Sequence, residues 1–480
     1  MIIKKFIPQN LKNIYHLAQA ILANLWFGFP ASPTRFAESR RAGRPSKKIK
    51  VIGITGTNGK TTTAQMIAKI LEEAGHSVAM ISTINFKLGK KEWVNKTKFT
   101  TLSSWATQKF IKQAVNAGCE YLILETSSHS LDQNRIWGVN YDTAVITNIT
   151  REHLDYHKTM KKYRHAKLAL FKKAKNIVVN LDMEKPSDFL SFSNDKKYAY
   201  SIKYDVSSIK YQEIKEKIGD VKLTVAKDVK LGMDSSSYII HNTKYIIHFP
   251  GKFNIENALA AVCVGLAEGI NLETSAKALE KIKGIPGRME NVRNNKGLNI
   301  IIDYAVTPDS LEKLYGLISE MKNKCHSRLD RESRMKSLVS EITLDSRFRG
   351  NDTDRGSNNN KRTIAVLGAC GERDRGKRPI MGEIVSRYAD YIIITNEDPY
   401  GEDPTQITNE LESGIKNHEL GKTYFKILDR REAIKKALQI AKPGDFIIIT
   451  GKGAEETMAI GNKRISWNDK KVILEVLREI

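Results

Sequence analysis

Residues 53–62, Gly-Ile-Thr-Gly-Thr-Asn-Gly-Lys-Thr-Thr, have the composition of a loop that binds a nucleoside triphosphate. They follow a short apolar run and open a helical pattern. Glycines allow backbone N–H groups to face phosphate oxygens, and the helix N-terminus adds a favourable dipole. Lys60 would reach the terminal phosphates, and the Thr61 hydroxyl would bind Mg²⁺. Ile54 stands at the first glycine of the strict motif, which leaves the tighter loop Gly56–Thr61, and we predict that this loop binds ATP.

Two later segments are rich in imidazole, carboxylate and hydroxyl groups. Residues 125–129, Glu-Thr-Ser-Ser-His, end one expected strand, and residues 148–157, Asn-Ile-Thr-Arg-Glu-His-Leu-Asp-Tyr-His, end the next. Parallel α/β sheets place their ligands at these strand ends. A carboxylate and an imidazole on adjacent strand ends can share one Mg²⁺ near the phosphates. Lys167 lies in the helix that follows.

Alternating strands and helices must position these groups. From residue 48 to about 180, short apolar strands are expected at 51–54, 78–84, 121–124, 143–147 and 177–180, with helices at 60–74, 104–117 and 158–173. This order predicts a mostly parallel sheet with helices on both faces. Residues 185–250 read as an antiparallel annex, and a helix near 254–269 returns to the nucleotide domain.

A second α/β set begins near residue 298 and has no phosphate-binding loop. Strands are expected at 299–303, 363–367, 391–395, 425–428 and 445–450, with helices at 308–321, 377–389, 404–415 and 430–441. The predicted fold class is therefore α/β, with a central P-loop ATPase domain and a C-terminal doubly wound, Rossmann-like domain. The predicted domains are 48–290 and 291–480, preceded by an N-terminal segment, 1–47.

Two polar, Arg-rich stretches interrupt this order. Residues 325–361 separate a helix from a strand where a short connection is expected, and residues 31–47 have a similar character. We predict that both are disordered surface insertions.

The composition limits the classes of function. The 480 residues carry a net charge of +24, but no nucleic-acid-binding motif is present and the lysines are scattered, so we expect no nucleic-acid partner. A basic cleft also suits an anionic, phosphate-rich substrate. Four isolated cysteines and the lack of a signal peptide predict a cytoplasmic protein.

Residues 11–28 form an apolar stretch that Lys12, Asn13 and His16 interrupt. This is too polar for a membrane span and predicts an amphipathic helix. The helix either docks on the body of the protein, which we favour, or makes weak contact with a membrane surface.

Together these segments resemble the Mur ligases, the ATP-dependent amino-acid ligases that build peptidoglycan precursors, and within them the MurE-type tripeptide synthetases. The resemblance covers residues 48–322 and 362–480. The motifs that carry it are 56–62, 100–101, 125–135, 147–157, 253–261, 286–290, 303–309, 371–379 and 451–453. Their number and order make a chance match untenable.

The resemblance implies a role for each matching residue. Phosphate and nucleotide contacts fall to Gly56, Thr57, Asn58, Gly59, Lys60, Thr61, Thr62, Asn254, Asn257, Arg288 and Asp303. Thr61, Glu125, His153 and a carbamylated Lys167 would hold Mg²⁺, with two ions expected. Lys60, Lys167 and Arg288 would act in catalysis. Thr100, Thr101, Ser127 and Arg135 would contact the muramoyl peptide, and Asp398, Tyr400 and Glu455 the free amino acid. Asp374, Lys377 and Arg378 lie in a motif near the amino acid.

The implied chemistry is acyl activation. The γ-phosphoryl group passes to a substrate carboxylate, an amine attacks the acyl phosphate, and phosphate leaves. The enzyme's main task is to neutralise and align two anions.

Four departures concern specificity. The N-terminal UDP-binding domain of MurE-type enzymes is expected to be missing, which raises the question of an acceptor without UDP. The family's Asp-Asn-Pro-Arg is Glu397-Asp398-Pro399-Tyr400, its Gly-Lys-Gly-His-Glu has Ala454 for His, and its Asp-Tyr-Ala-His has Val306 for His. A diamino acid, either diaminopimelate or lysine, is expected because Glu455 is kept.

Three alternatives remain open from the sequence. Folylpolyglutamate synthases share the ATPase core, and cyanophycin-type or amidating Mur-like ligases use other acceptors. A non-catalytic ATP-binding scaffold or regulatory subunit is disfavoured, because it would not need Lys60, Glu125, His153 and Lys167 together.

Overall fold

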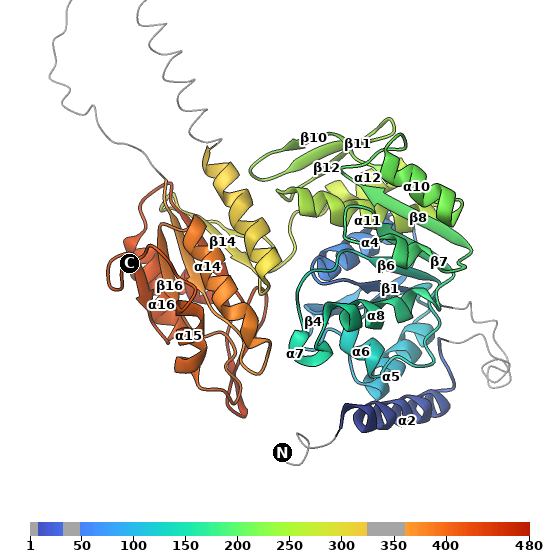
Figure 1. Cartoon of the computed structure of the whole chain (residues 1–480), viewed down its shortest axis with the longest axis horizontal. Helices are drawn as coiled ribbons and strands as arrows, with labels where there is room; N and C mark the ends of the chain where they lie inside the picture. Colours follow the sequence, from blue (N-terminus) through green and yellow to red (C-terminus); the bar gives the residue numbers. More distant parts are fainter. Residues whose placement is uncertain (1–7, 32–48, 324–360) are drawn as a thin grey trace, which may run out of the picture. The chain divides into compact units, whose positions relative to one another are not determined.

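The computed structural model describes residues 8–31, 49–323 and 361–480 (Figure 1). The chain divides into two compact units, one ending at Arg288 and the other beginning at Met289. The predicted insertions 31–47 and 325–361 lie, apart from Ala31 and Lys361, outside the described residues.

A nine-stranded sheet forms the centre of the first unit. Its strand order is β4-β3-β2-β5-β1-β6-β7-β8-β9, and neighbours from β2 to β9 run parallel, while the hairpin β3–β4 adds an antiparallel edge. The strands are β1 (Lys50–Thr55), β2 (Val78–Ile81), β3 (Asn85–Leu88), β4 (Lys91–Val94), β5 (Tyr121–Glu125), β6 (Thr143–Ile146), β7 (Asn176–Asn180), β8 (Lys196–Ser201) and β9 (Lys222–Val225).

Helices cover both faces of this sheet, because its central strands are apolar on both sides. On one face, Ile52 and Ile54 pack with α4 (Lys60–Glu73), α11 (Lys252–Ala267) and α12 (Leu272–Glu280). On the other face, Val51 packs in a core with α5 (Ser104–Asn116), α8 (Met160–Phe171) and α10 (Ile209–Ile218). The short helices are α6 (Ser128–Asp132), α7 (Leu154–His157) and α9 (Ser187–Leu190), and α2 (Gln9–Phe27) packs on α5.

The second unit is built on a six-stranded sheet of order β13-β14-β18-β15-β16-β17, parallel except for β13 at the edge. Its strands are β13 (Glu290–Val292), β14 (Asn299–Asp303), β15 (Thr363–Leu367), β16 (Tyr391–Ile394), β17 (Tyr424–Lys426) and β18 (Phe446–Thr450), with a hairpin of β19 (Thr457–Ile460) and β20 (Lys463–Ser466). Its helices span 308–323, η1 (Arg375–Lys377), α14 (Arg378–Tyr388), α15 (Pro404–Glu412), α16 (Arg430–Ile440) and α17 (Asp469–Glu479).

The predicted fold class is confirmed, but two local predictions were wrong. Residues 185–250 are not an antiparallel annex throughout, because β8 and β9 extend the parallel sheet. Only β10 (Lys227–Leu231), β11 (Ser236–Ile240) and β12 (Thr243–Ile247) form a separate antiparallel sheet. The strand expected at 78–84 stops at Ile81, because the chain turns into β3 there and the Ser82 hydroxyl donates to the Asn85 carbonyl at 3.0 Å.

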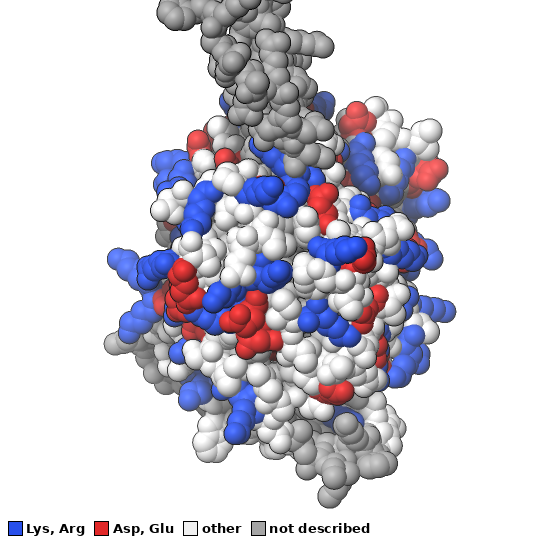
Figure 2. Space-filling view, turned by 90° about the vertical axis from the view of Figure 1, so that its left-hand side faces the viewer, with Lys and Arg blue, Asp and Glu red and all other residues white. Residues whose placement is uncertain are grey.

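One face of the molecule shows how its charged side chains are spread. On the face drawn in Figure 2, lysines and arginines are interleaved with acidic residues and do not gather into one continuous stripe. Among the described residues, no helix combines the length and the apolar character needed to cross a membrane.

Candidate active site

The loop between β1 and α4 is shaped by two glycines at close approaches. A Cβ at Gly56 would lie 1.9 Å from the Thr147 hydroxyl, and one at Gly59 would lie 2.2 Å from Asn257 Oδ1. Both residues have positive φ, at 148° and 85°. Only glycine fits these positions, so the backbone of the loop can pass close to Thr147 and Asn257 before α4 begins.

The segment after β6 holds this loop in place. The Thr57 amide donates to the Asn148 carbonyl at 2.9 Å, and the Asn58 amide donates to Asn148 Oδ1 at 2.9 Å. The Thr147 hydroxyl donates to the Asn58 carbonyl at 2.6 Å, and the Thr150 amide donates to the Thr57 hydroxyl at 2.9 Å. The loop between β1 and α4 is therefore supported by residues about ninety positions later, which pre-organises it.

Two lysine amines converge on one carbonyl of the loop. Lys60 Nζ donates to the Gly56 carbonyl at 3.0 Å and to the Thr57 carbonyl at 2.9 Å. Lys167 Nζ, on the buried side of α8, donates to the same Gly56 carbonyl at 3.0 Å and lies 4.5 Å from the Tyr163 ring centroid.

Burial depresses the pKa of both amines. Burial lowers the pKa of Lys60, and nearby Arg288 acts in the same direction against the opposing charge of Glu125. Burial and the charge of Lys60 hold the pKa of Lys167 well below its usual range. A neutral, buried amine at Lys167 can react with carbon dioxide, which a protonated ammonium cannot do.

Glu125 ends β5 and is fully buried. Its two carboxylate oxygens accept from the Thr83 amide at 3.0 Å and from the Thr83 hydroxyl at 2.8 Å. The carboxylate is thus fixed in orientation beside the loop.

His153 lies in a group of rings that follows β6. It has a left-handed backbone with φ of 57°, and its ring centroid is 4.7 Å from that of His129. His129 also packs on Tyr156 at 4.3 Å, and the buried His157 has Nε2 3.0 Å from the Ser128 hydroxyl. Burial lowers the pKa of His157, so neutral imidazole is favoured there.

The expected metal residues come from strands on either side of β1. Glu125 and His153 were expected on adjacent strand ends, but β1 lies between β5 and β6. The loop that follows β1 therefore lies between the end of β5, which carries Glu125, and the end of β6, which leads to His153. In the part of the chain that the structure describes, no group of three or more His, Cys, Asp and Glu side chains could hold a metal ion. A site for Mg²⁺ here would need oxygens beyond those side chains, such as the Thr61 hydroxyl, phosphates and water.

The residues expected at the nucleotide fall into both units. Asn257 lies against Gly59, and Asn254 Oδ1 accepts from Asn257 Nδ2 at 3.4 Å. Arg288 Nη2 donates to the Thr61 hydroxyl at 3.3 Å. In the second unit, Asp303 Oδ2 accepts from the Met289 amide at 2.7 Å, which fixes its carboxylate at the end of β14.

The residues expected at the muramoyl peptide form one hydrogen-bonded group. The Thr101 hydroxyl donates to the Glu125 carbonyl at 2.9 Å and accepts from the Ser127 amide at 2.9 Å. Arg135 Nη1 donates to the Thr101 carbonyl at 3.0 Å, and Thr100 reaches Thr83 through their hydroxyls at 3.1 Å. Burial lowers the pKa of Arg135, whose Nε is buried without a hydrogen-bond partner.

In the second unit, a buried lysine brings together the residues expected at the amino acid. Lys452 Nζ donates to Asp398 Oδ1 at 2.9 Å and also to Glu455 Oε2. The Ala459 amide donates to the same Asp398 oxygen at 2.7 Å. Lys452 is fully buried, so this pairing orients both carboxylates.

Tyr400 has a left-handed backbone, with φ of 51°, and the Arg373 guanidinium lies 5.9 Å from its ring centroid. Burial raises the pKa of Tyr400 to about 12, so the phenol stays neutral. Glu397 beside it is buried against Gly451, and burial together with Asp398 raises its pKa to about 7.

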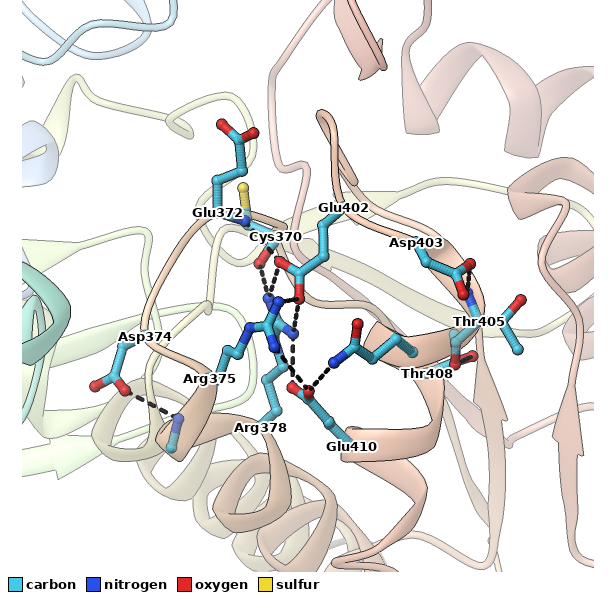
Figure 3. Close-up of polar contacts among 12 residues, drawn as sticks. Cys370, Glu372, Asp374, Arg375, Arg378, Glu402, Asp403, Thr405, Thr408 and Glu410 are labelled. Atoms are coloured by element: carbon cyan, nitrogen blue, oxygen red, sulfur yellow. Dashed lines mark hydrogen bonds and ion pairs between the residues drawn. The ribbon is translucent and has the colours of Figure 1, made fainter. Parts of the chain in front are cut away.

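Arg378 is buried inside the second unit, where it holds the loop before α14 in place (Figure 3). Its guanidinium is fully buried and donates to Glu402 at 2.8 and 2.9 Å, to Glu410 at 2.6 Å and to the Cys370 carbonyl at 3.1 Å. Arg375 adds a second ion pair to Glu402 at 2.8 Å. The Asp374 side chain caps the Gly376 amide at 3.0 Å. Arg378 and Asp374 therefore shape this motif, in which Lys377 is also buried.

Sequence reasoning assigned no role to several residues that build these sites. Asn148 supports the loop between β1 and α4, Thr83 orients Glu125, and the Tyr163 ring packs on the Lys167 amine. Asn148 lies in the motif at 147–157, so its position in the sequence was a signal for a role at the site. Thr83 and Tyr163 lay in ordinary strand and helix patterns, which gave no signal of their contacts.

Comparison with known proteins identifies the family. The Mur ligase middle domain model matches residues 54–265, and the Mur ligase glutamate ligase domain model matches residues 352–453. The UDP-N-acetylmuramoyl-L-alanyl-D-glutamate–2,6-diaminopimelate ligase of Clostridium tetani is 35% identical over 451 residues, which are 92% of this chain and 81% of that protein. The enzyme of the same name from Geobacillus kaustophilus is 34% identical over 96% of this chain and 87% of its own.

A solved structure of a ligase with that name is 27% identical, with a TM-score of 0.55, and the match covers 93% of this chain and 81% of that chain. The fold is that of an α/β protein with a central ATPase domain and a C-terminal α/β domain. The chain belongs to the Mur ligase family, whose members are ATP-dependent, ADP-forming amino-acid ligases.

Proposed function

We propose that this chain adds meso-diaminopimelate to UDP-N-acetylmuramoyl-L-alanyl-D-glutamate in peptidoglycan synthesis. The observation that supports this most directly is the convergence of Lys60 and Lys167 on the Gly56 carbonyl, at 3.0 Å each. Two amines on one oxygen suit a site whose occupants are anionic. The similarity to relatives named as diaminopimelate ligases supports the amino acid and the acceptor.

The loop and Lys60 would hold the phosphates of ATP, since the cradle between Gly56 and Gly59 excludes side chains. The acceptor's carboxylate attacks the γ-phosphorus, and ADP leaves. The amine of diaminopimelate then attacks the acyl carbon, and phosphate leaves with the C–O bond electrons. Lys60 and Arg288 would offset the negative charge as the two anions approach.

Thr61, Glu125, His153 and the carbamate of Lys167 are proposed to hold Mg²⁺. Thr61 and Glu125 supply oxygen atoms, which are the ligands that a hard cation such as Mg²⁺ prefers. The depressed pKa of Lys167 keeps its amine neutral and so favours formation of the carbamate. When bound, Mg²⁺ neutralises phosphate charge and aligns the transferred group.

Specificity for a diamino acid is assigned to the second unit. Asp398 and Glu455, both oriented by Lys452, can bind the distal ammonium group. Arg373 beside Tyr400 places a cation near the position where the family has an arginine for the distal carboxylate. This combination of charges matches diaminopimelate better than lysine, which has no distal carboxylate.

The experiment is phosphate release in Mg²⁺ with UDP-N-acetylmuramoyl-L-alanyl-D-glutamate and single amino acids. We expect release that requires both the nucleotide dipeptide and diaminopimelate. Release with lysine instead would overturn the amino-acid assignment. Release only with an acceptor that lacks UDP would overturn the acceptor assignment and favour another Mur-like ligase.

A further inference from the structure

Helix α2 presents large apolar side chains to solvent along its whole outer face. We call this set the outer stripe, and it consists of Leu11, Ile14, Tyr15, Ala18, Leu22, Leu25 and Trp26. The spacing is that of one helix face, and the exposed fraction is 61% for Ile14 and 74% for Trp26. A surface helix ordinarily carries polar residues at such positions.

The inner face of α2 fixes this orientation. Ala20, Ala23 and Asn24 are buried, and Asn24 Nδ2 donates to the Trp137 carbonyl at 2.8 Å. Asn13 Nδ2 donates to the Asp132 carbonyl at 3.1 Å. With small and polar residues facing the protein, α2 cannot turn its outer stripe inward without losing these contacts.

The outer stripe continues onto α5 through an aromatic group. Trp105 makes edge-on contacts with Trp26 at 6.3 Å and with Phe27 at 6.0 Å between ring centroids. A shallow hollow of about 600 Å³ is lined by Leu22, Leu25, Trp26 and Trp105. Tryptophan at the edge of an apolar surface is typical of groups that sit at a membrane–water interface.

Charge identifies the occupant. Helix α2 carries one lysine, Lys12, and no acidic residue, and the whole chain carries +24. Lys109 and Lys112 add exposed cations on α5, beyond Trp105. A second copy of this chain would bring the same positive charge and be repelled, whereas an anionic lipid surface would be attracted.

We propose that the outer stripe and Trp105 dock on the anionic surface of a lipid bilayer, with α2 lying in the plane of the interface. An amphipathic helix with aromatic and leucine side chains on one face and nearby lysines binds in this way. Helix α2 does not meet the requirements of a membrane span. The proposal is independent of the ligase reaction.

The test is co-sedimentation of the full chain with vesicles. One set is phosphatidylcholine alone and the other contains one third phosphatidylglycerol. We expect binding to the anionic set that weakens as salt is raised. A double variant, Leu22→Glu with Trp26→Glu, should lower that binding about tenfold or more, because two apolar anchors become repelled charges. Trp26→Phe should retain it.

The control variant is Ile209→Glu, which changes an equally exposed apolar residue, 78% accessible, on α10. It should bind vesicles as the unaltered chain does. Circular dichroism and light scattering accompany each variant. Absence of vesicle binding, or equal binding by the double variant, would overturn the proposal. A dimer that the double variant dissociates, without vesicle binding, would assign the outer stripe to a second copy instead.

Discussion

Two ionisable side chains at the candidate sites, Lys167 and Glu397, are buried, and burial disfavours the charged form of each. Lys167 is an amine with almost no exposure, placed beside Lys60 and an aromatic ring. Glu397 is a buried carboxyl whose Oε2 has no hydrogen-bond partner. Natural proteins keep such costly groups where function requires them, so each should show a trade between stability and activity.

For Lys167, we expect Lys167→Met to lower phosphate release by about 100-fold or more, since an amine that can form a carbamate is lost. The same variant should melt at a higher temperature in bicarbonate-free buffer, because a buried amine is replaced by an apolar chain of similar length. Thermal melting and phosphate release measure the two effects. Lys172→Met, an exposed lysine at the end of α8, serves as the control and should change neither.

The carbamate itself has a separate readout. Labelled bicarbonate should give a carbamate carbon signal in nuclear magnetic resonance of the unaltered chain that Lys167→Met lacks. A signal that persists in Lys167→Met would refute the assignment to this residue.

For Glu397, burial raises the pKa to about 7 from an ordinary value of 4.5. A carboxyl with a raised folded-state pKa keeps its proton longer in the folded than in the unfolded chain. It therefore lowers stability progressively as pH rises from 4.5 to 7. Glu397→Gln should remove this loss and be more stable at pH 8 by about 2–3 kcal/mol, with little difference at pH 4. Denaturant unfolding at both pH values measures this, and an equal difference at both would contradict it.

At the scale of elements, a buried ion pair connects the first residue of α16 to the first residue of α17. Arg430 and Asp469 are both fully buried and pair at 2.7 Å and 2.9 Å. Arg430 also donates to the Asn396 carbonyl at 3.2 Å and the Thr450 carbonyl at 2.9 Å. These carbonyls lie at the ends of β16 and β18, directly before the segments that carry Asp398 and Lys452.

Breaking this pair should destabilise the second unit strongly. Asp469→Ala leaves a buried guanidinium without its charge partner, which costs about 3–5 kcal/mol. The matched control is Glu475→Ala, which removes the exposed partner of Arg431 on the same two helices and should cost less than about 1 kcal/mol. Denaturant midpoints compare the two variants. Equal losses would show that burial does not govern the pair's contribution.

At the scale of the whole molecule, the proposed nucleotide loop and the proposed diamino-acid segment belong to separate compact units. Residues 56–62 and 147–150 are joined by hydrogen bonds in the first unit, while residues 397–400 and 451–461 are joined in the second. Each ligand should therefore order its own unit.

Hydrogen–deuterium exchange on the full chain tests this division. MgADP should protect 56–62 together with 147–150, and diaminopimelate alone should protect 397–400 together with 451–461. An amino acid without distal charge, such as alanine, serves as the control and should protect neither. Protection of the loop by diaminopimelate alone would contradict the separate assignment.

Much of the architecture follows from local sequence. Apolar runs of four to six residues predict the strands, and 299–303 and 363–367 were placed correctly to the residue, because parallel strands covered on both faces are continuously apolar. The loop at 56–62 is predicted for a similar reason, since a glycine loop between a strand and a helix is a short-range pattern. The family resemblance depended on many such patterns in order.

Only the tertiary structure decided what lies against what. Strand order put β1 between β5 and β6, continued the sheet through β8 and β9, and brought Asn148, Thr83 and Tyr163 to the site. Tertiary packing also buries the Arg378 side chain among its ion-pair partners, and it leaves the apolar outer stripe of α2 facing solvent. Local pattern fixes which face of an element is apolar, because the period of a helix or strand is local. Which elements pack on each other depends on contacts between residues distant in sequence, and these contacts form only when the chain folds.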